Sequence, residues 1–286
     1  MANIKRRLVQ IANRVLKPLS LQLDSLTAAN REMGQIHQLQ KDGHFDRMIY
    51  SLPECVKTAA YQSILADLPK YGTRFASFTE PDHNDVRFSS ANPFYTSPDA
   101  EILYILVRQL APRRIFETGC GNSTRVIRQA IIDGNLPSKV TSVDPEPRTD
   151  ITGFTDEILR CRIEALDPAE IATGLAPGDI LFIDTSHEGR ACNDVAYLFC
   201  RLIPLLKAGV VVHVHDVFLP WEYPQDWIVR EKRLAWTEQY LLHALISSNK
   251  YKILWPGYYL QKTLPNFNAL FPRIGSRRAQ SFWFVI

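Results

Sequence analysis

The sequence has little of what would mark an unusual class of protein. Its 286 residues include only five cysteines, with no Cys-x-x-Cys pair, which argues against a disulfide framework or a zinc knuckle and favours a reducing cytoplasm. No run reaches the roughly 18 consecutive apolar residues that a membrane-spanning helix needs. The formal net charge of +3 is too small to indicate a nucleic-acid partner. The first seven residues lack the apolar core of a secretory signal.

What is present is the composition of a folded globular chain, with 46% hydrophobic and 22% charged residues. Residues 1–96 have the pattern of helices and polar loops and are expected to form a helical N-terminal extension. A second domain is expected over residues 97–286. It begins with Ser97-Pro98-Asp99, a helix start in which Ser caps, Pro takes the first helical position and acids follow. This helix should run to about Leu110.

From about residue 113, short β-branched runs alternate with helical stretches, which is typical of βαβ units and a parallel sheet. Strands are expected at 114–118, 139–144, 160–164, 179–184, 210–216, 251–255 and 281–286. Helices are expected at about 123–133, 155–159, 168–173, 190–206 and 232–248. The last strand follows a connection without a helix, so it should pair antiparallel. The sequence therefore predicts an α/β fold with a doubly wound, seven-stranded, mostly parallel sheet.

A glycine turn, Gly119-Cys120-Gly121, follows the first expected strand and precedes a helix. Glycines let a backbone turn sharply and approach a ligand closely, although many such turns carry glycine for structural reasons alone. Asp144 ends the second strand, where a carboxylate can accept hydrogen bonds from two ribose hydroxyls or simply cap a strand end. Thr124 stands where a dinucleotide-binding motif has Gly or Ala, which disfavours NAD and FAD.

Acids and histidines gather at the ends of the fourth and fifth expected strands. Asp184, Asp216 and His215 are candidate ligands of a divalent cation. His187 is a candidate general base, because a hydroxyl must lose its proton as it attacks a methyl group. For His215 a structural role remains equally open, and His213 is expected to be a satisfied buried histidine. The aromatic segment 218–227 suits an acceptor, a hydrophobic plug or an oligomer contact.

The run Glu117-Thr118-Gly119-Cys120-Gly121 resembles motif I of the class I S-adenosylmethionine (SAM)-dependent methyltransferases, and Ser142-Val143-Asp144 resembles their ribose-binding strand end. The resemblance extends over residues 113–286. It implies a set of SAM contacts: Gly119 and Gly121 at the methionine moiety, Glu117 near its ammonium group, Asp144 at the ribose, and Ala165 and Leu166 beside the adenine.

A narrower resemblance concerns the catalytic side. Asp184-x-x-His187 followed by an acidic strand end is similar to the metal-dependent sugar O-methyltransferases of macrolide biosynthesis, the mycinamicin and macrocin type. In that family two adjacent acids end the strand, whereas here His215 replaces the first of them. Mg²⁺ prefers oxygen ligands, and Mn²⁺, Fe²⁺ or Zn²⁺ accept imidazole, so the identity of the metal, and even its presence, stays open.

The sequence thus predicts a cytoplasmic SAM-dependent O-methyltransferase that acts on a small-molecule or saccharide hydroxyl. One alternative is a metal-dependent enzyme of another class on the same scaffold. Another is a non-catalytic, membrane-associated SAM-binding subunit, suggested by residues 1–20. There Ile4, Leu8, Ile11 and Val15 recur at helical spacing among basic residues, with Pro18 expected to end the helix. Such a helix suits an anionic membrane surface, or packing and dimerisation in a homo-oligomer.

Overall fold

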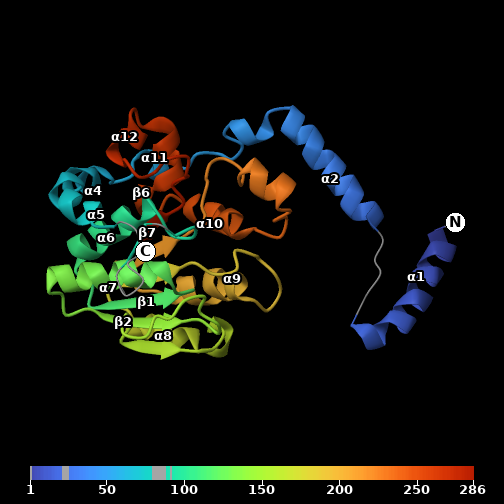
Figure 1. Ribbon diagram of the computed structural model, residues 1–286, viewed down its shortest axis with the longest axis horizontal. Helices are drawn as coiled ribbons and strands as arrows, with labels where there is room; N and C mark the ends of the chain where they lie inside the picture. Colours follow the sequence, from blue (N-terminus) through green and yellow to red (C-terminus); the bar gives the residue numbers. More distant parts are fainter. Residues whose placement is uncertain (1, 21–25, 79–87, 91) are drawn as a thin grey trace.

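A seven-stranded sheet forms the centre of the computed structural model, which describes residues 2–20, 26–78, 88–90 and 92–286 (Figure 1). The strand order is β3-β2-β1-β4-β5-β7-β6. All neighbours pair parallel except β7, which is antiparallel to both β5 and β6. The expected fold class is confirmed, including the reversed last strand. The strands are β1 (Arg114–Thr118), β2 (Lys139–Val143), β3 (Glu157–Leu159), β4 (Ile180–Ile183), β5 (Val211–Val214), β6 (Lys252–Pro256) and β7 (Phe282–Val285).

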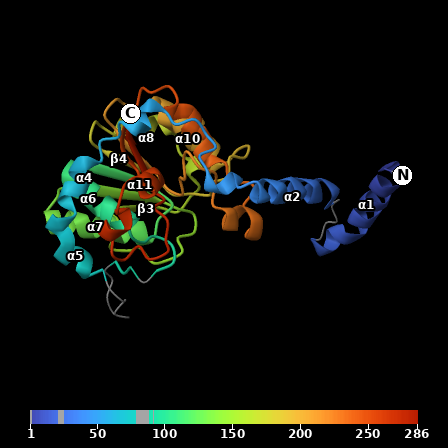
Figure 2. The same ribbon diagram turned by 90° about the horizontal axis from the view of Figure 1, so that it is seen from above.

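Helices cover both faces of this sheet, and others precede it in the chain (Figures 1 and 2). Before the sheet the helices are α1 (Ala2–Leu16), α2 (Leu26–Lys41), α3 (Glu54–Lys57), α4 (Gln62–Asp67), α5 (Gly72–Ala76) and α6 (Asp99–Leu110). Between and after the strands they are α7 (Asn122–Gly134), α8 (Pro168–Gly174), α9 (Asp194–Tyr197), α10 (Glu238–Ile246), α11 (Gly257–Thr263) and α12 (Phe267–Leu270). Among the described residues before α6 there is no strand, as expected.

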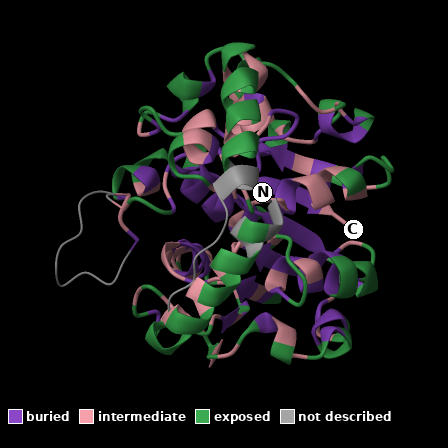
Figure 3. Cartoon of the chain, turned by 90° about the vertical axis from the view of Figure 1, so that its right-hand side faces the viewer, coloured by how far each residue is buried: buried purple, intermediate pink, exposed green. Residues whose placement is uncertain are grey.

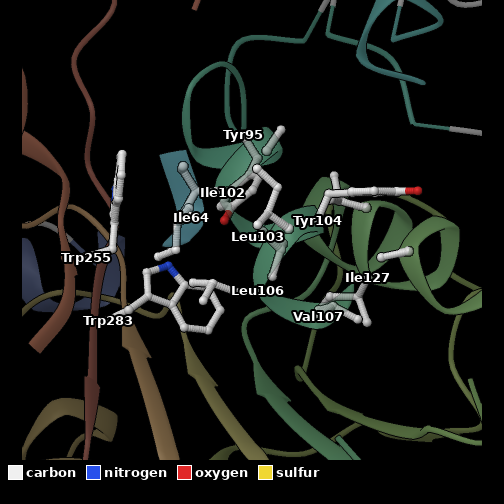
Figure 4. Close-up of a cluster of buried hydrophobic side chains, with 14 of the residues drawn as sticks. Ile64, Tyr95, Ile102, Leu103, Tyr104, Leu106, Val107, Ile127, Trp255 and Trp283 are labelled. Carbon is white, nitrogen blue, oxygen red and sulfur yellow. The ribbon is translucent and has the colours of Figure 1, made fainter. Parts of the chain in front are cut away.

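Two hydrophobic cores lie on the two faces of the sheet, because successive strand residues point to opposite sides. On β4, Phe182 belongs to one core and Ile183 to the other. The first core is packed by α4 to α7 and contains both Trp255 and Trp283 (Figure 4). The second is packed by α8, α9 and α10. Figure 3 shows the buried residues concentrated in this layered body. The central strands β4 and β5 are buried along their whole length, which explains why they are apolar except for His213.

The third strand differs from the sequence prediction, which places it at residues 160–164. It lies at Glu157–Leu159, where a helix was expected, and a short 3₁₀ turn at Ile163–Ala165 occupies the expected strand. Asp156 explains the difference, because its carboxylate accepts a hydrogen bond from Val140 N at 2.9 Å, and its own N–H donates to Val140 O. These bonds align the residues after Asp156 with β2. A strand of three residues is too short to show a period in the sequence.

Helix starts also differ from the sequence prediction. α6 begins at Asp99 with Pro98 at the capping position and no side-chain cap, so Ser97 is not the cap. α9 begins at Asp194 rather than near residue 190, because the side chain of Asn193 caps it. α10 begins at Glu238, later than residue 232, which leaves the preceding residues free to line a cavity. No helix of the described chain combines the length and the apolarity needed to cross a membrane.

Candidate active site

A cavity of about 810 Å³ opens at the carboxyl ends of β1, β2, β4 and β5. This is where ligands bind in open parallel sheets. Its lining brings together most of the residues singled out in the sequence: Gly119, Gly121, Asp144, Asp184, His187, His215 and Asp216. The volume lies within the range of small-molecule sites.

Gly119 lies in the turn after β1, between the ends of the two strands that flank β1 in the sheet, β2 and β4. Its φ is +74°, and a Cβ atom there would stand 1.6 Å from the carbonyl oxygen of Asp184. Its N–H donates to Val143 O at 3.0 Å, so β2 and the end of β4 both enclose the turn. Gly121 differs, because a Cβ there would meet only Thr149 Oγ1, at 3.9 Å, and Gly121 itself lines the cavity. Gly119 is therefore required by the fold, whereas Gly121 leaves space beside the cavity.

Asp144 connects the glycine turn to the end of β2. Its carboxylate accepts hydrogen bonds from Cys120 N at 3.2 Å and from Glu146 N at 2.8 Å. Each carboxylate oxygen has a second lone pair, so Asp144 keeps acceptor capacity on the side that lines the cavity. The residue thus lies where the sequence predicts a ribose-binding acid.

Glu117 lies beneath the cavity and is absent from its lining. Its fully buried carboxylate accepts hydrogen bonds from the hydroxyls of Ser123, Thr124 and Ser142 at 2.7 to 2.9 Å. Burial raises its pKa to about 7, against the effect of the three hydroxyls. Thr124 Oγ1 also accepts from Gly121 N, which explains a threonine at this position. Glu117 therefore supports the turn from below.

The residues that line one wall of the cavity differ from those expected to contact the adenine. Ala165 and Leu166 do not line the cavity, whereas Ile163 and Glu164 do. The 3₁₀ turn at Ile163–Ala165 replaces the expected strand end and presents its first two residues. The misplaced third strand thus accounts for the different residues at this wall.

The two strand ends meet at His187. Its Nε2 lies 3.2 Å from Asp216 Oδ2 and 3.4 Å from Asp184 Oδ1. One ligand atom each from Asp184, His187 and Asp216 lie within 4.8 Å of one another, which is compatible with a metal ion. Left-handed backbone at His187 and Asp216, with φ of 61° and 58°, turns both side chains toward this point. Regular strand alternation would place Asp216 on the face of the sheet opposite His215. The left-handed residue brings its carboxylate to the same side as His187 instead.

Glu238 is a member of this cluster that the sequence analysis missed. It is fully buried at the first turn of α10, and its Oε2 lies 2.8 Å from His187 Nδ1. The backbone carbonyl of His187 also accepts N–H bonds from Thr237 and Glu238. A glutamate 51 positions further along the chain carries no local signal of this contact. The only available cue was an acid at a helix start, which is common for other reasons.

The acids determine the charge state of His187. Burial alone would lower its pKa, but Asp216, Asp184 and Glu238 outweigh burial and raise the pKa well above the ordinary value of a histidine. For Asp184 burial acts upward, yet His215 and His187 lower the pKa to about 2. The cluster therefore favours ionised Asp184 beside a protonated imidazole.

His215 and His213 have different surroundings, although both are buried on β5 or just after it. His215 Nδ1 lies 3.5 Å from Asp216 Oδ1 and 3.9 Å from Asp184 Oδ2, and its Nε2 lies 3.7 Å from Asp99. His213 stacks on Phe182 with ring centroids 3.9 Å apart. Among the described residues neither ring nitrogen of His213 has a hydrogen-bond partner. His213 is buried as expected, but stacking rather than hydrogen bonding holds it.

The aromatic segment after β5 is divided between packing and cavity. Phe218 and Tyr223 are buried in a small hydrophobic cluster, so part of the segment is a plug. Trp227 instead lines the cavity, together with Trp236 and Arg233. The guanidinium of Arg233 lies 4.5 Å from the Trp227 ring and 4.4 Å from the Trp236 ring. Trp236 also lies 4.4 Å from the His187 ring, so this wall borders the cluster of Asp184, His187 and Asp216.

Known proteins are similar to this chain in structure over most of its length and match it in sequence over a shorter segment. The structure is similar to an O-methyltransferase from Bacillus cereus in complex with SAH, at 16% identity over 79% of this chain and 91% of that chain, with a TM-score of 0.42. It is also similar to an SAH-bound Podospora anserina methyltransferase, at 13% identity over 92% of this chain and 97% of that chain, with a TM-score of 0.41. No curated protein matches the sequence. Residues 116–217 match the family described as a methyltransferase domain.

Proposed function

We propose that this protein transfers the methyl group of SAM to a hydroxyl of a small molecule or saccharide. One observation carries the proposal: a single cavity joins the glycine turn and Asp144 to the cluster of Asp184, His187 and Asp216. A methyl donor bound on the first side would therefore face the acids and the imidazole on the second. The match of residues 116–217 to a methyltransferase domain supports the same class of reaction.

The cofactor side fits SAM. Gly121 lines the cavity without a side chain, and only Thr149 would meet a Cβ there, so a ligand can approach the backbone closely. Asp144 offers acceptor oxygens for a ribose. Glu117 acts by holding the turn through Ser123 and Thr124 rather than by touching the ligand.

His187 is proposed as the group that receives the proton of the acceptor hydroxyl. Glu238 accepts from Nδ1, which leaves Nε2 as the atom that can take a proton in the cavity. Nε2 is also the atom nearest to Asp184 and Asp216. The acceptor would lie along the wall of Trp227, Arg233 and Trp236, where flat rings suit the face of a sugar or an aromatic ring.

The chemistry of Asp184 and Asp216 suits a divalent cation. One carboxylate oxygen of each acid lies within 4.8 Å of the other and of His187, so the two carboxylates could hold a cation while Nε2 of His187 stays free to take the proton. Such a cation would lower the pKa of an acceptor hydroxyl. By offsetting the charge of Asp184 and Asp216 it would also lower the pKa of His187, so that the imidazole is neutral when it takes the proton. His215 lies beside the two acids and is proposed as a further ligand.

Replacing Asp144 with alanine should weaken SAM binding by about 1–3 kcal/mol, or roughly 5- to 150-fold, through lost hydrogen bonds to the ribose. Calorimetric titration of the purified chain with SAM measures this. Asp150→Ala is a suitable control, because Asp150 is exposed and does not line the cavity. An Asp144→Ala protein with wild-type affinity and unchanged thermal unfolding would contradict the ribose assignment.

Removal of divalent metal should abolish methyl transfer, and Mn²⁺ or Mg²⁺ should restore it. The assay uses radiolabelled SAM with a panel of saccharide and phenolic acceptors, before and after chelation. Asp184→Asn and Asp216→Asn should each weaken Mn²⁺ binding, measured by titration, about tenfold or more. Glu146→Gln is the matched control, since Glu146 lines the same cavity outside the cluster. Full activity of the chelated wild-type protein would remove the metal from the mechanism.

A further inference from the structure

Helix α1 carries an exposed apolar stripe. Ile4, Leu8, Ile11 and Val15 are 65%, 61%, 60% and 70% exposed. Their spacing of three and four residues places them on one side of the helix. Large apolar side chains gathered in this way on a surface mark an interaction site more often than chance exposure does.

The rest of the described chain leaves this stripe uncovered. Figures 1 and 2 show α1 and α2 extending away from the layered body. No residue of α1 belongs to a hydrophobic cluster, and none of the described side chains of α1 or α2 is buried (Figure 3). The link to the body runs through Ile36 of α2 and through Phe45, which pack on the cluster of Phe218 and Tyr223. The stripe thus faces outward on an arm.

The charge of the N-terminal segment indicates which kind of partner binds the apolar stripe. Residues 1–20 contain five basic residues and no acid, although the whole chain has 33 basic and 30 acidic residues. The remainder is therefore slightly acidic, and the positive charge is concentrated on the arm. Arg7 and Arg14 flank the apolar stripe, about 70° and 90° from its centre at 100° per residue, and Lys17 follows α1 in a 3₁₀ turn. Pairing α1 with the same helix of a second copy would bring eight positive charges together without an acid to offset them, four from each helix.

We propose that α1 binds an anionic membrane surface, lying flat with the stripe of Ile4, Leu8, Ile11 and Val15 in the acyl boundary. The basic residues would then contact lipid phosphates, which a neutral surface or a second basic helix cannot match. The charge and the apolar stripe act together, so loss of either should release the protein. This proposal is independent of the methyl-transfer reaction.

Sedimentation of the full chain with lipid vesicles tests it. About tenfold more protein should pellet with vesicles of phosphatidylcholine containing phosphatidylglycerol than with phosphatidylcholine alone, and high salt should reduce the difference. Leu8→Ser with Ile11→Ser, and separately Arg7→Gln with Arg14→Gln, should each lower pelleting to the level of neutral vesicles. Ile132→Ser is the matched control, because Ile132 is 64% exposed on α7, in the body.

Unchanged thermal unfolding of each variant shows that the body is intact. Equal pelleting with both vesicle types, or wild-type pelleting of both double variants, would overturn the proposal. The proposal would also be overturned if the wild-type protein failed to bind vesicles and formed a dimer in sedimentation velocity, and if the Leu8→Ser, Ile11→Ser protein were monomeric. That last result would assign the stripe to a second copy of the chain.

Discussion

Replacing His187 with alanine should lower the turnover number by roughly 10²–10⁴ and leave SAM affinity unchanged, because general-base catalysis contributes about that much. The structure supports a selective effect. His187 touches Asp184, Asp216 and Glu238, whereas the cofactor side of the cavity is built by Gly119, Gly121 and Asp144. Steady-state methylation and calorimetric SAM titration on the same preparation separate the two quantities.

Two further variants sharpen this result. Glu238→Gln keeps a hydrogen-bond partner for Nδ1 but removes its charge, so the turnover number should fall by less than in His187→Ala, again with unchanged SAM affinity. His243→Ala should have no effect, since His243 lies on the same helix as Glu238, outside the cavity, and contacts Ser51. Full activity of His187→Ala would contradict the general-base role and leave catalysis to the positioning of donor and acceptor and to the cation.

Replacing Gly119 with alanine should reduce the free energy of unfolding by about 2–5 kcal/mol. The left-handed backbone costs roughly 1–2 kcal/mol for a residue with a Cβ. The methyl group would also overlap the carbonyl oxygen of Asp184, 1.6 Å away, and such overpacking typically costs about 1–3 kcal/mol. Moving that carbonyl would displace Asp184 as well, so the affinities for SAM and for the metal, measured by titration, should both fall. Denaturant unfolding measures the stability.

Gly121→Ala is the control for this prediction. A Cβ there meets only Thr149, so stability should change by less than about 1 kcal/mol. The added methyl group would instead occupy the approach to the cavity and weaken SAM binding about 5- to 150-fold, equivalent to 1–3 kcal/mol. If Gly119→Ala is as stable as the wild type, the close contact between the turn and β4 is wrong.

Local sequence patterns were sufficient for most of the sheet. The strands around Phe116, Val140, Leu181 and Val212 could be predicted because each is a short run rich in apolar and β-branched residues that alternates with helical stretches. β7 is reversed as expected, but the reason was wrong: the connection before it contains α11 and α12, so only the pairing with β5 and β6 defines its direction. β3 was misplaced because three residues carry no period, and only pairing with β2 defines it.

The sequence by itself determined the fold class, the glycine turn and the acids at the strand ends, since each depends on residues that are adjacent or periodic in the chain. Tertiary structure decided the rest. It buried Glu117 under the turn, turned Asp216 toward His187 through a left-handed residue, and placed Glu238 against Nδ1. The contacts of Glu117 with Ser142 and of His187 with Asp216 and Glu238 join different segments of the chain. Their geometry comes from the packing of α7 and α10 on the sheet, which no local pattern of residues encodes.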